Sequence, residues 1–295
     1  MTAGRDRGRP DMLDRQDLEG YERDGFIVRD GFLAPETCDR VIARSVQVVD
    51  ELASQAAPTA FSTRLQKETA DRYFLTSGDK VRSFFDDGAF GPDGRLLRPH
   101  RQAVNKIGHA LHDLDPFFSA ISRDPRLAAI ARDVGLRRPL LLQSTVIFKQ
   151  ARTGGEVVSH QDSMYLYTDP PSCTGFWFAL EDAGIENGCL WVLPGGHTGP
   201  LAARYRRMAD GAVRFDPPDP PAFDEARFVP LPAKKGALIV LHGLLPHRSG
   251  ANRSPHSRHA FTLHVIDGTS RYPADNWLVR GPDMPLRGFA GANVP

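Results

Sequence analysis

Apolar residues recur at two different periods along the chain, and the period changes near residue 139. Before that point they return every three or four positions, which predicts helices at 13–24, 33–53, 117–122 and 126–134. Two strands, at 25–28 and near 105–112, interrupt these helices. After residue 139 short apolar runs predict strands at 140–150, 175–180, 189–192, 237–241 and 258–266. This order favours a mostly β fold with flanking helices and a double-stranded β-helix (jelly-roll, cupin-like) core.

Local composition suggests how the chain is organised. Residues 1–12 are polar and charged, which predicts a disordered tail. The turn signal Glu186-Asn187-Gly188 predicts a hairpin between two neighbouring strands. Residues 13–295 are expected to form a single domain with a helical front (13–135), a jelly-roll core (about 139–268) and, within the core, a Pro- and Arg-rich surface insert or lid (about 201–232).

Composition narrows the possible functions. The chain has 295 residues, of which 41% are hydrophobic, enough for one large, well-packed core. Its 37 basic and 36 acidic side chains leave a net charge of +1, so no overall field favours nucleic acid or a membrane surface as partner. Three scattered cysteines fit a reducing compartment, and no apolar leader or long apolar segment is evident. We therefore expect a cytoplasmic protein that acts on a small molecule.

A short His-x-Asp motif carries the first sign of chemistry. His160 and Asp162 are two residues apart in a predicted strand, so both side chains are expected on one face. His247 follows 87 positions later, after an apolar strand, and completes a set of two imidazoles and one carboxylate. That set, with open positions on the metal, is typical of non-haem Fe(II) oxygenases. His-x-Asp alone also occurs by chance, so the motif needs a further residue to support it.

Arg258 provides that support. It lies 11 residues after His247 at the start of a predicted strand, close enough for its guanidinium to return beside the histidine. An arginine fork binds a carboxylate through two hydrogen bonds, as the far end of a dicarboxylic 2-oxo acid on iron requires. A second interpretation remains: a metal-binding jelly-roll protein, hydrolase, isomerase or sensor, that does not use 2-oxoglutarate.

Five stretches resemble one known family. They are YFLTSGDK (73–80), NKIGHALH (105–112), GEVVSHQD (155–162), ENGCLW (186–191) and SRHAFT (257–262). In this order, over about residues 18 to 280, the chain resembles the phytanoyl-CoA dioxygenase (PhyH) family of Fe(II)/2-oxoglutarate oxygenases. The resemblance implies a dioxygenase that uses Fe(II), 2-oxoglutarate and O₂, and hydroxylates a small molecule with release of succinate and CO₂.

The resemblance also implies individual roles. His160, Asp162 and His247 match the iron ligands, and Arg258 matches the arginine that pairs with the distal carboxylate of 2-oxoglutarate. The other positions that match cosubstrate contacts are Ser249, Lys106, Trp177 and Thr145, the last standing where relatives carry Met. Related halogenases lack the carboxylate, so Asp162 favours hydroxylation or desaturation over halogenation. The family spans several substrate classes, so it does not choose a substrate.

The remaining candidates have two interpretations each. Tyr73, Tyr165 and Tyr167 are expected to shape the substrate pocket. His264 shares strand parity with Arg258 and could face the site, but we expect a packed core histidine. His242 is expected to be structural or to support the metal ligands rather than to bind the metal itself. His109 and His112 either approach the pocket near Lys106 or have surface or core roles. A basic cluster either faces solvent or binds an acidic substrate tail; it comprises Arg204, Arg206 and Arg207.

Overall fold

Two antiparallel sheets face each other in the computed structural model, which describes residues 12–53, 72–93 and 95–290. The predicted tail over 1–12 lies outside these residues except for Met12. The large sheet has the order β1 (Phe26–Arg29), β11 (Leu238–His242), β6 (Thr174–Ala179), β13 (Arg258–Asp267), β4 (Pro139–Lys149), β3 (Val104–His109), β2 (Val81–Phe85). The small sheet has the order β10 (Val229–Leu231), β7 (Leu190–Val192), β12 (His247–Ser249), β5 (Val157–His160). This arrangement confirms the predicted jelly-roll core.

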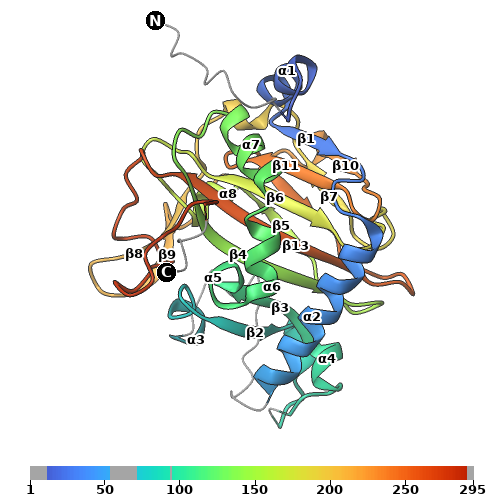
Figure 1. The fold of residues 1–295 in the computed structure, drawn as a ribbon. Coiled ribbons are helices and arrows are strands. Elements are labelled where there is room, and N and C mark those ends of the chain that lie inside the picture. Colours follow the sequence, from blue (N-terminus) through green and yellow to red (C-terminus); the bar gives the residue numbers. More distant parts are fainter. Residues whose placement is uncertain (1–11, 54–71, 94, 291–295) are drawn as a thin grey trace, which may run out of the picture.

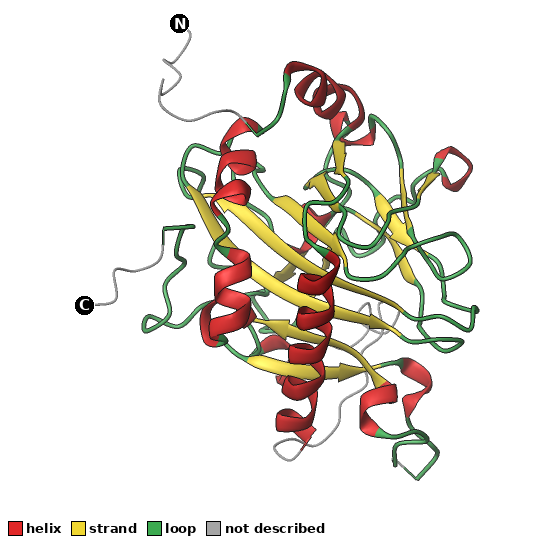
Figure 2. Ribbon diagram, turned by 45° about the vertical axis from the view of Figure 1, so that its right-hand side comes forward, coloured by secondary structure: helices red, strands yellow, loops and turns green. Residues whose placement is uncertain are grey.

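Helices cover one face of the large sheet (Figures 1 and 2). The longest, α2 (Pro35–Ala53), crosses this face, and its buried residues join a core with the outward side chains of β13. Aspartates cap the starts of α1 (Arg15–Asp24), α6 (Pro116–Ser122) and α7 (Pro125–Asp133), and a proline follows the cap in α6 and α7. The shorter helices are α3 (Arg72–Leu75), α4 (His100–Ala103), α5 (Leu111–Leu114) and α8 (Asp162–Tyr165).

Strand β13 sets the geometry of the inner face. It pairs with β4 on one side and β6 on the other, so Thr262 lies opposite both Thr145 and Trp177. His264 lies opposite Gly175 on β6 in the same way. Phe261, Leu263 and Val265 belong to the core under the helices, so by strand alternation the even-numbered residues face the small sheet. The face of β13 that looks toward the small sheet therefore carries polar side chains, among them Thr262 and His264.

Several predicted elements differ from the structure. The helical front contributes β1, β2 and β3 to the large sheet, and β2 was not predicted because its apolar residues do not alternate. The stretch at 105–112, expected as a strand that runs into a loop, forms β3 as far as His109 and then continues into helix α5 instead of a loop. The predicted hairpin at residues 186–188 is wrong: a turn does form there, but it connects β6 of the large sheet to β7 of the small one.

The predicted insert at 201–232 contains strands. Its first part forms a two-stranded ribbon of β8 (Arg204–Arg207) and β9 (Val213–Asp216). Its last residues form β10, which pairs with β7 as the edge of the small sheet. The second half of this segment is thus partly built into the jelly roll. No helix in the described part of the chain is long and apolar enough to cross a membrane.

Candidate functional site

A cavity of about 180 Å³ lies between the two sheets and is lined by residues from both. A cavity of about 150 Å³ is enough to hold a benzene molecule, so this one has room for a small molecule and not only for an ion. The inner faces of β13, β4 and β6 form one wall, and the ends of β5 and β12 form the other. Every metal and cosubstrate candidate that the sequence predicted lines this cavity.

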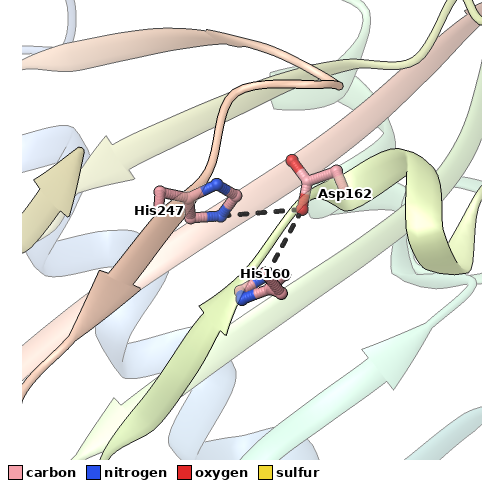
Figure 3. A group of neighbouring side chains, drawn as sticks. All are labelled: His160, Asp162 and His247. Carbon is pink, nitrogen blue, oxygen red and sulfur yellow. Dashed lines mark ion pairs between the residues drawn. The ribbon is translucent and has the colours of Figure 1, made fainter. Parts of the chain in front are cut away.

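The three candidate metal ligands meet at one end of the cavity (Figure 3). His160 ends β5, His247 begins β12, and these two residues are directly paired across the strands. The expectation that Asp162 shares a strand face with His160 is wrong, because the strand stops at His160 and Asp162 opens helix α8. The bend still brings Asp162 Oδ1 to 3.7 Å from His160 Nε2 and 3.6 Å from His247 Nε2. One ion can contact all three atoms, since metal–ligand bonds are about 2.2 Å long.

Backbone hydrogen bonds orient both imidazoles toward the centre. His160 Nδ1 lies 2.8 Å from the Val158 carbonyl, and His247 Nδ1 lies 3.0 Å from the Leu245 carbonyl. Because a carbonyl only accepts, each Nδ1 must carry the proton, and each Nε2 offers a lone pair to the cavity. Burial lowers the pKa of His247 to about 4, so its ring is neutral near pH 7.

Asp162 is held as a carboxylate. Burial alone would raise its pKa, but the neighbouring His264 and His247 more than offset this, and its pKa lies well below the usual range. His264 Nε2 lies 3.3 Å from Asp162 Oδ2, so the prediction of a packed core histidine is wrong: His264 contacts the carboxylate and lines the cavity. Gly175 makes room for this contact, because a Cβ there would lie 2.9 Å from Asp162 Oδ2.

A buried cation occupies the other end of the cavity. Arg258 is 1% exposed, and its Nη2 donates to Ser249 Oγ at 3.2 Å. The Ser249 hydroxyl in turn donates a hydrogen bond to the Gly188 carbonyl. The Arg258 guanidinium lies 5.4 Å from the Trp177 ring centroid. Burial lowers the pKa of Arg258 to about 10, so it remains charged near pH 7. Its Nε and Nη1 have no hydrogen-bond partner among the described residues.

Lys106 and Thr145 line the wall between these two ends. Lys106 Nζ lies 5.3 Å from the ring centroids of Phe74 and Phe84, and burial lowers its pKa well below the usual value. Thr145, on β4, packs against Gly108, where a Cβ would approach its hydroxyl to 3.0 Å. Gly108 therefore leaves room for the Thr145 hydroxyl on the neighbouring strand.

The aromatic candidates divide into two groups. Tyr165 lines the cavity and contacts the His160 ring at 5.8 Å between centroids. Tyr73 and Tyr167 are not among the residues that line it, because Tyr73 stacks under Arg82 and Tyr167 under Arg204. Lining residues that the sequence did not identify include Phe74, Trp277, Gln143, Asn105 and Thr262. Phe74 directly follows Tyr73 in the chain, and the sequence does not reveal which of these two side chains faces the cavity.

The other side chains with two interpretations lie as follows. His109 lines the cavity, whereas His112 and His242 do not. The arginine cluster is already paired: Arg204 and Arg206 contact Asp275 at 2.6 and 3.1 Å, and Arg207 donates to the Trp277 carbonyl. It therefore fastens the ribbon to the C-terminal segment.

Comparison with known proteins identifies the family of this chain. The family model for phytanoyl-CoA dioxygenase (PhyH) matches residues 21–260. The chain belongs to the phytanoyl-CoA dioxygenase family. A phytanoyl-CoA dioxygenase of Arabidopsis thaliana is 42% identical over 275 residues, covering 92% of this chain and 93% of the relative. The phytanoyl-CoA dioxygenase domain-containing protein 1 of Bos taurus is 41% identical over 283 residues, covering 93% and 97%. The resemblance noted from the sequence motifs is confirmed.

Solved structures share the fold of this phytanoyl-CoA dioxygenase family member. The epimerase SnoN, crystallised with Fe³⁺, alpha ketoglutarate and nogalamycin RO, superposes with a TM-score of 0.61 at 18% identity, covering 92% of this chain and 93% of SnoN. EctD from S. alaskensis, crystallised with Fe, also superposes with a TM-score of 0.61 at 18% identity, covering 92% and 82%. At this identity the likeness concerns the fold alone.

Proposed function

We propose that this chain is an Fe(II)- and 2-oxoglutarate-dependent oxygenase that hydroxylates a small molecule. The observation that carries the proposal is Arg258, a buried cation with unused donors, in the same cavity as the His160, Asp162 and His247 cluster. A simple metal site has no need of a buried guanidinium, whereas a dicarboxylate bound to the metal needs a partner for its far end. Membership of the family and the iron and alpha ketoglutarate bound to SnoN support the same proposal.

The donor set fits ferrous iron. The Nε2 atoms of the two imidazoles and one carboxylate would hold it and leave the other positions open for 2-oxoglutarate and O₂. The bound group would supply the oxidation that turns 2-oxoglutarate, O₂ and a C–H bond into succinate, CO₂ and an alcohol. The chain itself orients the cosubstrate and excludes water. Arg258 and Ser249 hold the distal carboxylate of 2-oxoglutarate, and Trp177 and Thr145 shape the cavity wall beside it. Lys106 adds a buried amine to the same wall.

The test measures cosubstrate use directly. We expect succinate from 2-oxoglutarate with Fe(II) and O₂, and a visible charge-transfer band when 2-oxoglutarate is added to the Fe(II) protein without oxygen. Asp162→Ala is expected to lose both signals, because it removes an iron ligand. Asp182→Ala is the matched control: it removes an exposed carboxylate that pairs with Lys234 at 2.8 Å, and both signals should persist.

The alternative, a metal-binding jelly-roll protein that does not use 2-oxoglutarate, predicts a different result. Such a protein would bind iron at His160, Asp162 and His247 but give neither succinate nor the band. That outcome would leave Arg258 as a partner for some other anion and would contradict the proposed function.

A further inference from the structure

His109 is a buried cavity residue that iron and 2-oxoglutarate binding do not use. It ends β3, is 1% exposed and lines the cavity. Three aromatic rings surround it, with centroids 5.5 Å away for Phe74 and 5.3 Å away for both Phe84 and Trp277. Its Nε2 is buried and has no hydrogen-bond partner among the described residues. A polar atom left in this state is costly unless a ligand or water satisfies it.

Hydrogen bonding on the other side of the ring fixes the tautomer. Ser77 Oγ lies 2.5 Å from the Phe74 carbonyl and 2.8 Å from His109 Nδ1. A carbonyl has no proton to give, so the hydroxyl proton must lie between Ser77 and Phe74. Ser77 Oγ then accepts from His109 Nδ1–H, and Nε2 is left with a lone pair. Burial also lowers the pKa of His109 well below its usual value, which keeps the ring neutral.

We propose that His109 Nε2, framed by Phe74 and Trp277, is a substrate subsite that accepts a hydrogen bond from a hydroxyl or N–H group on an otherwise apolar molecule. The inference rests on the proposed function, because it concerns the molecule to be hydroxylated. A donor group satisfies the lone pair, whereas an ether or carbonyl oxygen at the same place would set two acceptors against each other.

Indole and benzofuran provide a matched pair of probes. They have nearly the same size and shape, but indole has an N–H where benzofuran has an ether oxygen. Equilibrium dialysis against the Fe(II)- and 2-oxoglutarate-loaded protein, without oxygen, measures both affinities. We expect indole to bind about 5- to 100-fold more tightly, the range for leaving a buried acceptor unsatisfied. Equal affinities, or no binding of indole, overturn the proposal.

Two variants separate a binding role from a structural one. His109→Phe keeps a ring but removes the acceptor, so indole and benzofuran should bind this variant with nearly equal affinity. Ser77→Ala removes the acceptor for Nδ1–H, which frees the ring to carry its proton on Nε2, and the preference should shrink or reverse. A preference that survives both substitutions contradicts the proposal. His242→Phe is the control, since His242 is half-buried outside the cavity and the preference should persist.

The same dialysis distinguishes this inference from the proposed function. Repeated without iron and 2-oxoglutarate, it tests the subsite alone. A protein that makes no succinate but prefers indole through His109 would retain the subsite and lose the proposed activity. A protein that makes succinate without any indole preference would do the opposite. Thermal melting of each variant shows whether a lost preference reflects unfolding.

Discussion

Two buried arginines occupy opposite situations in this molecule. Arg280 donates to Asp113 at 3.0 Å and to the Leu142 carbonyl at 2.9 Å, and its Nη2 lies 2.9 Å from His112 Nε2. Arg258 donates only to Ser249 Oγ, and its Nε and Nη1 have no partner among the described residues. Both side chains are almost fully buried, so both charges have lost most of their contact with water.

The partners of a buried arginine indicate whether it stabilises the fold or binds a ligand. A buried ion is costly unless other groups in the protein compensate it, as Asp113 does for Arg280. Arg280 is therefore paired with a carboxylate in the folded chain and contributes to stability, although its Nε has no hydrogen-bond partner among the described residues. Arg258 has no carboxylate partner among the described residues, and a bound anion would supply one. We expect substitutions at the two positions to separate stability from ligand binding.

The largest expected effect is on cosubstrate binding. Arg258→Ala should raise the dissociation constant of 2-oxoglutarate about 100- to 1000-fold, because it removes two charge-assisted hydrogen bonds. Iron affinity should change less than about twofold, since Arg258 is not a metal ligand. Anaerobic titration of the charge-transfer band measures the first and iron binding the second. Equal loss of both would mean that Arg258 is structural, and Arg258→Lys, which keeps charge without the fork, should be intermediate.

Arg280→Ala should have the reverse pattern. It leaves Asp113 buried with fewer partners, so the free energy of unfolding should fall by about 3 kcal/mol. Urea denaturation at pH 7 measures this loss. The affinity for 2-oxoglutarate should stay within about twofold of the wild type, because Arg280 does not line the cavity. If 2-oxoglutarate binding falls instead, the comparison between the two arginines is wrong.

The sequence predicted the composition of the site better than its geometry. His160, Asp162, His247 and Arg258 could be found because their residue types and spacing suit one chemistry. The shared strand face of His160 and Asp162 could not be predicted correctly, because a turn at Gln161 replaces the strand. The alternation of side chains between two faces holds only within a regular strand. The metal ligands lie where strands begin or end, so alternation does not predict their directions.

The roles of His264 and Tyr73 depended on long-range pairing. His264 faces the cavity because β13 lies between β4 and β6. Sequence periodicity does not reveal which strands are neighbours in a sheet. Tyr73 and Phe74 are consecutive aromatics, and only packing against β2 places Phe74 at the cavity. The fold class was predictable because helices precede many short strands; the registers that assemble the site were not.

Ligand-linked stability sharpens the comparison. 2-Oxoglutarate at about 100 times its dissociation constant should stabilise the Fe(II) protein by about 2.7 kcal/mol, because it binds only the folded state. Arg258→Ala should lose nearly all of this increment at the same ligand concentration. Arg280→Ala should start from a lower stability and keep the full increment. Urea titrations with and without 2-oxoglutarate, without oxygen, measure all three proteins.

The smallest expected effect is the acid sensitivity of the Arg280 cluster. Burial alone would raise the pKa of Asp113, but its hydrogen bond to His112 and the charges of Arg123 and Arg280 outweigh this and lower it. A carboxyl whose pKa is lower in the folded state stabilises the protein above its unfolded pKa, near 3.9, and this stability is lost as pH falls further.

Asp113→Asn should therefore cost about 2 kcal/mol at pH 7, discounted for partial solvent screening, and progressively less below pH 4. The difference in unfolding free energy between wild type and variant, measured from pH 7 to pH 3, isolates this carboxyl from the others. Arg280→Ala should flatten the same pH dependence, because it removes one of the cations that hold the pKa low, whereas Arg258→Ala should leave it unchanged. A pH dependence that responds to Arg258 rather than Arg280 would place the acid-sensitive charge in the cavity and reverse the assignment of the two arginines.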